Sequence, residues 1–404
     1  MKNLLFIGTN HKREYLYKAK SFGYNIIVAD NNFDNFDNLA EAVIKVDINN
    51  YDELLTKVIS FNDTTHIDGV ITVHEHAVEQ VALISSALEL PGVKFIGAVN
   101  CRNKYLSRNI LKRNKIIHPK FLLSTTSELE KNIEKIGYPC IVKPLKYSGS
   151  SGVIKISDKK EQRNMLDYVK HQRENSSCKD TLIDTLQNYW IIEEYLTGFE
   201  ISVQTISFEN KTDIITIHDK VVPMDGPEFA EEYILTPSPR IDKILEDKIK
   251  NVSTNILKAM GFNFGVAHLE FRIVNGEPIL LEVNGRLGGG TTNDIIYYST
   301  GIDLFKALVD ITVGNIPDIK RKYNKCVAVK RIQLKEGVIK DISGFEDAKA
   351  EKGVKLVHQW MYVGDRVRTT TRDVGGAVLG IANTPQEALD IVENAVNKIK
   401  FTIE

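Results

Sequence analysis

The sequence has few cysteines and no long hydrophobic run. Among 404 residues there are four cysteines, Cys101, Cys140, Cys178 and Cys326, and no Cys-x-x-Cys pair. This usage is typical of reduced thiols in a cytoplasm and disfavours a disulfide scaffold or a zinc ribbon. The apolar run near Met1 is too short for a signal peptide. No stretch approaches the roughly 20 apolar residues that span a membrane. We therefore expect a cytoplasmic protein without a membrane partner.

Neither sign of charge predominates, and two common nucleotide-binding signatures are missing. The chain has 52 Lys and Arg against 53 Asp and Glu, with no concentrated basic tract, so no nucleic-acid partner is expected. The first turn, GTNHKRE, lacks the Gly-x-Gly-x-x-Gly of dinucleotide-binding domains, and no Gly-Lys-Ser/Thr occurs. Asp30, which ends the second expected strand, is weak support for a ribose-binding acid. An NAD-dependent dehydrogenase is therefore an outside alternative.

The first hundred residues alternate short apolar runs with helical patterns. NLLFIGTN, YNIIVADNN and IDGVITVHEH read as buried strands, and the segments between them have helical spacing. Such alternation predicts a parallel sheet with right-handed crossovers, that is, an open α/β domain over residues 1–100. The segment VHEH lacks the His-Glu-x-x-His spacing of a zinc site. We expect it to form a loop that walls a substrate site.

A second region, near residue 280, places three polar side chains at every second position. In ILLEVNGRLGGG, an extended strand would put Glu282, Asn284 and Arg286 in one row on the same face. Carboxylate and amide oxygens suit a hard divalent cation, and a guanidinium suits a phosphate or an oxyanion. The alternative is an ordinary edge strand whose polar face meets water.

The strand before it, FGVAHLEFRIV, is expected to pair with this row as a hairpin. With an odd-length loop centred on Gly276, Glu270 would lie opposite Glu282, and His268 opposite Asn284. Two ionised carboxylates that close repel one another unless a cation lies between them, which predicts Mg²⁺. A two-residue Asn-Gly turn would instead shift the register by one and separate the two acids.

Two further motifs suit a nucleotide. KPLKYSGSSG combines Lys143 with a loop of small residues whose amides and hydroxyls can contact an anion, namely Ser148, Gly149, Ser150, Ser151 and Gly152. EEYLTGFE places Glu193 and Glu200 around a turn. Without other features, the first motif is compatible with a flexible hairpin tip and the second with an ordinary hairpin.

Four motifs together resemble those of the ATP-grasp ligases: HLEF…LLEVNGRLGG, IVKP…SGSSGV, EEYLTGFE and CRNKYLSR. The resemblance extends over nearly the whole chain and implies a mixed α/β and α+β fold. It implies an N-terminal open parallel-sheet domain over 1–100 and an ATP-grasp core over 101–320. The core would comprise a small lid lobe at about 120–195 and a large lobe at about 196–320. A C-terminal α+β subdomain would occupy 321–404.

The resemblance also implies roles for individual residues. Lys104 and Lys143 would contact the ATP phosphates, and Ser148 to Gly152 would cover the transferred phosphoryl group. Glu193 and the backbone of Glu194, Tyr195 and Leu196 would hold adenine, and Glu200 would bind ribose. Glu270, Glu282 and Asn284 would hold two Mg²⁺ ions, with Mn²⁺ as an alternative, and Arg286 would act in catalysis. One departure is Gly285, where many members have proline; we expect it to loosen the strand end.

The motif NGRLGGG resembles carboxylate–amine ligases that join amino acids, including the L-amino acid ligases. This implies small-molecule carboxylate and amine substrates, an acyl-phosphate intermediate, and release of ADP and phosphate. A purine-pathway or biotin-carboxylase-like enzyme is the alternative, and a homodimer is the oligomeric form considered. Candidate substrate contacts are Lys220, Glu231, Glu232, His268, Gly288 and Gly289. The segment that contains Glu231 could instead be a solvated surface loop. His268 could instead have a structural role.

Overall fold

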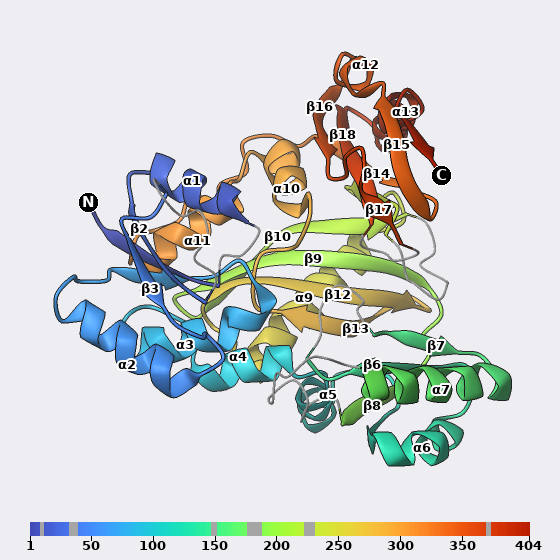
Figure 1. The fold of residues 1–404 in the computed structure, drawn as a ribbon, viewed down its shortest axis with the longest axis horizontal. Helices are drawn as coiled ribbons and strands as arrows, with labels where there is room; N and C mark the ends of the chain where they lie inside the picture. The colour runs from blue at the N-terminus through green and yellow to red at the C-terminus, as the bar shows by residue number, and fades with distance from the viewer. Residues whose placement is uncertain (9–11, 32–38, 147–151, 176–187, 222–230, 369–372) are drawn as a thin grey trace.

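The computed structural model describes residues 1–404 except 9–11, 32–38, 147–151, 176–187, 222–230 and 369–372, and leaves out the side chains of 168–175. Within the described residues no helix is both long and apolar enough to cross a membrane. The strands of this described part form four sheets, and the largest lies in the middle of the molecule (Figure 1). The mixed α/β and α+β fold class predicted from the sequence is confirmed.

The N-terminal sheet is parallel, as the alternating pattern predicts. Its order is β3-β2-β1-β4. The strands are almost continuously apolar because helices cover the sheet, which buries side chains such as Leu4, Leu5 and Phe6 completely. The strands are β1 (Asn3–Ile7), β2 (Asn25–Asp30), β3 (Ala42–Lys45) and β4 (Gly69–Ile71). The helices are α1 (Arg13–Ser21), α2 (Tyr51–Asn62), α3 (Val78–Ala87) and the 3₁₀ turn η1 (Glu75–Ala77).

A small antiparallel sheet follows after two linking helices, α4 (Phe95–Arg102) and α5 (Lys104–Arg113). Its order is β5-β8-β6-β7. The strands are β5 (Phe121–Thr125), β6 (Cys140–Pro144), β7 (Ile154–Ile156) and β8 (Tyr189–Glu194). The helical elements are η2 (Thr126–Glu128), α6 (Leu129–Ile136) and α7 (Lys159–Asn175). β8 does not pair with β9, so EEYLTGFE connects two different sheets and is not an ordinary hairpin.

The large sheet is antiparallel with the order β13-β12-β9-β10-β11-β14-β18-β16. Its first strands are β9 (Phe199–Phe208), β10 (Lys211–Lys220), β11 (Tyr233–Thr236), β12 (Gly265–Val274) and β13 (Glu277–Asn284). Helix α9 (Lys243–Met260) packs on one face through Ile249, Ile256 and Leu257. It begins after the capping side chain of Asp242 and ends at Gly261, whose left-handed conformation is typical of a helix C-terminus.

The C-terminal residues extend this same sheet. β14 (Cys326–Gln333) pairs with β11, and β18 (Val374–Ala382) and β16 (Val354–Gln359) follow it. A three-stranded sheet contains β15 (Gly337–Ser343), β17 (Arg366–Val367) and β19 (Lys400–Ile403). The remaining helices are α10 (Thr292–Thr300), α11 (Leu304–Thr312), α12 (Phe345–Lys349) and α13 (Pro385–Val396). The domain boundaries expected from the sequence stay predictions.

The β12–β13 hairpin differs from the expected odd-length loop. Val274 pairs with Glu277, so the turn contains only Asn275 and Gly276, both with positive φ (50° and 76°). A β-bulge then inserts Leu281 between the pairs Phe271–Leu280 and Glu270–Glu282. The expected turn was therefore wrong. The bulge nevertheless restores the predicted register, with Glu270 opposite Glu282 and His268 opposite Asn284.

Candidate active site

The facing carboxylates of β12 and β13 are each paired with a lysine. Lys220, at the end of β10, has its Nζ 3.3 Å from Glu270 Oε2 and 2.5 Å from Glu200 Oε1. Lys104, at the start of α5, has its Nζ 3.0 Å from Glu282 Oε2. The repulsion expected between the two glutamates is thus compensated by ammonium groups from two other elements. The charge repulsion between Glu270 and Glu282 can therefore be compensated without a metal ion.

These ion pairs shift the protonation of the buried groups. Burial would raise the pKa of Glu270, but Lys220 and the hydrogen bond from His268 hold it well below its usual value. Burial likewise opposes ionisation of Glu282, yet Lys104 lowers its pKa. The pKa of Lys220 is raised well above normal despite burial, because Glu200, Glu270 and Glu231 surround it. Both facing glutamates are therefore carboxylates at neutral pH.

Arg286 lies at the end of β13 and is held by the N-terminal domain. Its Nε lies 2.9 Å from Glu75 Oε2, Nη1 donates to Leu287 O (2.6 Å), and Nη2 donates to Asn284 Oδ1 (3.4 Å). Asn284 Nδ2 in turn donates to Glu282 Oε1 at 3.0 Å. The predicted row of Glu282, Asn284 and Arg286 is therefore one connected polar chain.

Glu193 of β8 and Lys143 of β6 meet on the small sheet. Lys143 Nζ lies 2.7 Å from Glu193 Oε2, and Arg108 Nε lies 2.7 Å from Glu193 Oε1. Arg108, which is fully buried, also donates from Nη2 to the carbonyl of the bulge residue Leu281 at 2.6 Å. Burial opposes ionisation of Glu193, but Arg108 and Lys143 lower its pKa, so the carboxylate is charged. One arginine thus connects the small sheet to the bulge that positions Glu282.

The expected adenine and ribose residues lie along the neighbouring strand ends. Glu200 Oε2 is 3.6 Å from Arg272 Nε, and Arg272 Nη1 donates to Leu196 O (2.8 Å) and to the Tyr195 hydroxyl (3.0 Å). Tyr195 N donates to Pro139 O at 3.1 Å, and Glu194 Oε1 accepts from Lys120 N at 2.8 Å. These residues line one junction between the lobes, but their nucleotide roles stay predictions.

The phosphate loop is only partly described. Ser148, Gly149, Ser150 and Ser151 lie outside the described residues. Gly152 has φ of 70°, a conformation that favours glycine, and a Cβ there would approach Pro144 Cγ at 3.1 Å. On the other side of the loop, Lys146 Nζ lies 2.9 Å from Glu79 Oε1 of α3. The loop therefore begins at a contact with the N-terminal domain.

The candidate substrate residues divide into two groups. His268 Nε2 lies 3.0 Å from Glu270 Oε1 and its Nδ1 2.7 Å from Gln204 Nε2, so it supports a carboxylate of the site. Gly288 packs on this ring, since a Cβ there would lie 2.9 Å from His268 Nδ1. Glu231 approaches Lys220 (3.5 Å) and binds Arg331 (2.6 Å). By contrast, a Cβ on Gly289 would have no neighbour within 4 Å. The backbone carbonyl of Glu232 accepts a hydrogen bond from Arg331 N at 2.9 Å.

Sequence reasoning missed three charged residues of the site. Glu75 lies in the VHEH segment, which was expected only to wall the site, and it binds Arg286. Arg108 lies within the quoted CRNKYLSR motif, four residues after Lys104, which would have placed it one helical turn away. Arg272 falls two residues after Glu270, hence on the same strand face. The same alternation rule that found the β13 row would have found Arg272.

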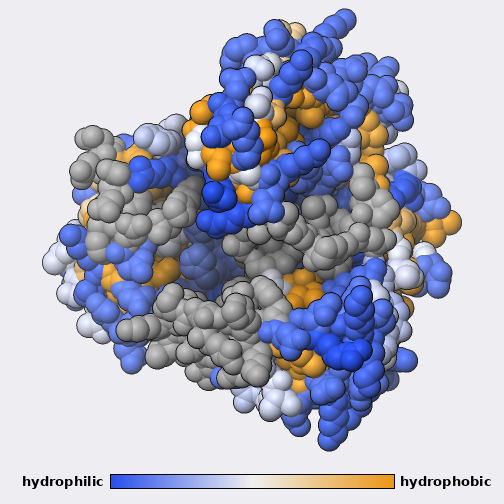
Figure 2. Space-filling view, turned by 45° about the vertical axis from the view of Figure 1, so that its right-hand side comes forward, coloured by the Kyte–Doolittle hydropathy of each residue, from blue (hydrophilic) through white to orange (hydrophobic). Residues whose placement is uncertain are grey.

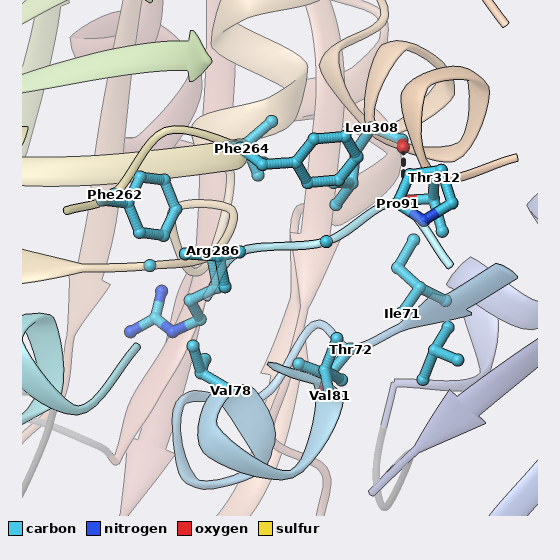
Figure 3. A pocket seen from close by; sticks show the side chains of 16 residues that line it. Ile71, Thr72, Val78, Val81, Pro91, Phe262, Phe264, Arg286, Leu308 and Thr312 are labelled. Atoms are coloured by element: carbon cyan, nitrogen blue, oxygen red, sulfur yellow. Dashed lines mark hydrogen bonds between the residues drawn. The ribbon is translucent and has the colours of Figure 1, made fainter. Parts of the chain in front are cut away.

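A small apolar cavity of about 50 Å³ lies behind Arg286 (Figure 3). Its walls include Val78 and Val81 of α3, Phe262, Phe264 and Leu308. Figure 3 shows the guanidinium pointing away from Phe264 and Leu308, so only the stem of Arg286 borders the cavity. The expected loosening of the strand end by Gly285 stays a prediction. A Cβ there would lie 2.8 Å from Phe262 Cε2, so the glycine makes room for the phenyl ring.

The chemistry of this edge fits a divalent cation bound with nucleotide. Two carboxylates on facing strands and the amide of Asn284 provide oxygen donors of the kind that Mg²⁺ prefers. In the described part of the chain, no group of three or more His, Cys, Asp and Glu residues is arranged to hold a metal ion. Phosphate and water oxygens would complete the coordination. Figure 2 shows a recess left of the centre of the view, with hydrophilic residues at its bottom.

Models of known domains match three parts of the chain. The ATP-grasp N-terminal domain matches residues 16–92, the ATP-grasp domain residues 136–294, and the L-amino acid ligase C-terminal domain 2 residues 332–404. The crystal structure of an L-amino acid ligase from Bacillus licheniformis superposes with a TM-score of 0.85 at 23% identity, covering 100% of this chain and 99% of that one. These matches confirm the fold that the motifs predicted.

Two proteins that are similar in sequence cover most of the chain. An uncharacterized protein of Sinorhizobium fredii is 25% identical over 368 residues, covering 89% of this chain and 73% of the relative. Alanine–anticapsin ligase of Bacillus subtilis is 25% identical over 274 residues, covering 64% of this chain and 57% of that enzyme. The chain therefore contains an ATP-grasp N-terminal domain and an ATP-grasp domain, has the ATP-grasp fold, and is similar in sequence to a carboxylate–amine ligase.

Proposed function

We propose that this protein is an ATP-dependent carboxylate–amine ligase that joins two amino acids and releases ADP and phosphate. The observation that carries the proposal is the facing pair of Glu270 and Glu282, with Asn284 and Arg286 continuing the same row. This arrangement can bind a metal–nucleotide complex next to a guanidinium that is suited to an acyl phosphate. The match of residues 332–404 to an L-amino acid ligase domain supports amino acids as substrates.

The ion pairs of the site suggest how nucleotide binding proceeds. Lys104 and Lys143 are bonded to Glu282 and Glu193, and both would turn to the phosphates of ATP when it binds. Two Mg²⁺ ions held by Glu270, Glu282 and Asn284 would neutralise phosphate charge so that a carboxylate can approach; Mn²⁺ is the alternative. Glu193 and the backbone of Glu194 to Leu196 would bind adenine, and Glu200 the ribose.

The second half of the reaction needs donors where charge develops. When the amine attacks the acyl phosphate, negative charge appears on the carbonyl oxygen. Arg286, oriented by Glu75, and the amides of the turn at Gly288 and Gly289 would lie near this oxygen. The loop at Ser148 to Gly152 would exclude water, which otherwise hydrolyses the intermediate. Glu231 and Lys220 would meet charges of the amino acids.

The test is release of ADP and phosphate across a panel of amino acids, singly and in pairs. We expect release with certain pairs, and hydroxamate formation from one amino acid when hydroxylamine replaces the second. Formation of AMP and pyrophosphate would contradict the acyl-phosphate route. If no amino acid supports release, the purine-pathway or biotin-carboxylase-like alternative becomes the better hypothesis, and calorimetry with ATP–Mg²⁺ against NAD excludes or reveals a dehydrogenase.

A further inference from the structure

A second arginine lies at the far end of the glycine-rich turn. Arg331, on β14, has its Nη2 3.2 Å from where a Cβ of Gly290 would lie, and 2.6 Å from Glu231 Oε1. Its side chain is 21% exposed. Its Nε is buried and has no hydrogen-bond acceptor among the described residues. The guanidinium therefore keeps a donor available after it has paired with Glu231.

The start of α10 provides another available donor beside this arginine. Thr291, which precedes the helix, is 2% exposed, and its hydroxyl has no partner in the described part of the chain. It does not cap the helix either. Helix α10 packs along β14, with Ile295 against Val327 and Val329, and Lys325 N bonds to Ser299 O at the other end. The amino end of α10 therefore lies near Arg331, because Gly290, whose Cβ would be 3.2 Å from Arg331 Nη2, directly precedes Thr291.

This place is close to the reacting edge. Gly288 contacts His268, which touches Glu270, while Gly290 contacts Arg331. Two residues separated by one along the chain have Cα atoms at most about 7 Å apart. The guanidinium of Arg331 and the carboxylates that are expected to hold the metal are thus connected through the same short turn, Gly288 to Gly290.

We propose that Arg331, with the Thr291 hydroxyl and the amino end of α10, binds the α-carboxylate of the acceptor amino acid. This inference rests on the proposed function and specifies its second substrate. The donor's own carboxylate reacts at the metal edge beside Arg286. An acceptor amino acid brings a second carboxylate, one carbon away from the attacking amine. A guanidinium beyond the glycine turn, whose Nε has no acceptor among the described residues, suits that group in charge and place.

The proposal predicts that the enzyme prefers a free amino acid as acceptor over an amine without a carboxylate or an amino acid whose carboxyl group is blocked. The experiment uses the best donor–acceptor pair from the amino-acid panel. It compares three nucleophiles: the free acceptor, its C-terminal amide, and hydroxylamine, which has no carboxylate. For the unaltered protein we expect a markedly lower KM for the free acceptor than for its amide. Equal use of the free acid and the amide would overturn the proposal.

The variants are Arg331→Met and Arg331→Lys, with Lys330→Met as the matched control. Lys330 is the next cation on the same strand, faces the other side, and binds Glu393. We expect Arg331→Met to raise the KM of the free acceptor about 10- to 100-fold and to abolish the preference over the amide. The hydroxamate rate should fall by a much smaller factor, and Arg331→Lys should restore part of the preference.

The remaining outcomes also decide. If Arg331→Met lowers peptide and hydroxamate formation by the same factor, the arginine is structural and the proposal is wrong. A raised KM for the donor in the hydroxylamine reaction would place Arg331 on the other substrate and equally overturn it. If Arg331→Met does not fold, Arg331→Lys and the comparison of acid with amide still decide. Absence of ADP release with every amino acid and with hydroxylamine would instead refute the proposed function itself.

Discussion

Lys220 lies against Glu270 on the active face of the large sheet, with 3.3 Å between Nζ and Oε2. The same ammonium contacts Glu200 and Glu231, so one cation serves three carboxylates in a largely buried place. Removing one partner of a buried ionic cluster leaves uncompensated charge, which costs far more than a surface pair. Lys220 is therefore expected to stabilise the protein before any nucleotide binds.

Replacing this lysine should destabilise the protein in a way that depends on the metal. We expect Lys220→Met to lower the free energy of unfolding by about 3–5 kcal/mol. Mg²⁺ with a non-hydrolysable ATP analogue should recover part of this loss, because a bound cation replaces the missing charge. Urea denaturation with and without the ligand measures both effects. Lys248→Met, which removes the exposed pair with Glu277, is the control and should cost no more than about 1 kcal/mol. Equal losses for the two variants would contradict this prediction.

Arg286 and Glu75 should act as a unit in catalysis. Arg286→Ala is expected to lower kcat/KM by about 10²–10³-fold while ATP binding is retained, since the guanidinium acts on charge that develops during the reaction. Glu75→Gln, which removes the 2.9 Å ion pair, should have a smaller effect. The double variant should lose no more than Arg286→Ala alone, because both changes affect one contact. Kinetics and calorimetry with ATP test this. An equal loss of ATP affinity and of rate in Arg286→Ala would refute the role.

The close packing of Gly285 on Phe262 gives a third prediction. Gly285→Ala would bring a Cβ to 2.8 Å from Phe262 Cε2 and 3.3 Å from Val78 Cγ1. We expect a loss of about 1–3 kcal/mol in unfolding free energy, as is usual for overpacking. Combining it with Phe262→Leu should cost less than the sum of the two single changes. Gly289→Ala, with nothing near its Cβ, is the control for stability. Additive losses would show that the ring does not require the glycine.

His218 should make the protein sensitive to acid. Burial, together with the neighbouring His268, lowers the pKa of His218 to about 3. An unfolded histidine titrates near 6.5, so between these two values the unfolded chain binds a proton that the folded chain does not. The free energy of unfolding should therefore fall by about 1.4 kcal/mol for each pH unit as the pH drops from about 6.5 toward 3.

The measurement for His218 compares denaturation curves from pH 7 to 4. His218→Gln removes the titrating group but keeps a partner for Thr216, whose hydroxyl lies 2.8 Å from His218 Nε2. The variant should lose stability less steeply with falling pH than the unaltered protein. His66→Gln, which changes an exposed histidine, is the control. Parallel curves for the His218 variant and the unaltered protein would show that this residue does not titrate as expected.

Alternation along strands predicted the facing pair of Glu270 and Glu282, but not how the chain builds it. The facing of Glu270 and Glu282 was predicted correctly from an incorrect turn. The Asn-Gly pair forms the two-residue turn that its positive φ values favour, and the bulge at Leu281 compensates. The bulge carbonyl accepts a hydrogen bond from Arg108 of a distant helix. Such a contact depends on tertiary packing, so a local pattern could not have revealed it.

Contacts between distant segments account for the other residues that were missed. Glu75 and Arg286 are separated by more than two hundred residues and meet only because the N-terminal domain lies against the end of β13. Nothing near Glu75 in the sequence indicates an arginine partner. By contrast, the parallel N-terminal sheet depends on local periodicity and was predicted correctly. Periodic patterns thus predicted the elements, while pairings across domains required the structure.

The continuity of the large sheet limits how the protein can be shortened. β14 donates and accepts hydrogen bonds along β11, from Tyr233 opposite Lys330 to Thr236 opposite Val327. Cutting the chain near residue 320 would make β11 an exposed edge strand. Its unpaired amides and carbonyls could then form hydrogen bonds with other copies of the chain. The residues after about 320 therefore protect the edge of β11 by pairing with it, and a chain that lacks them should aggregate.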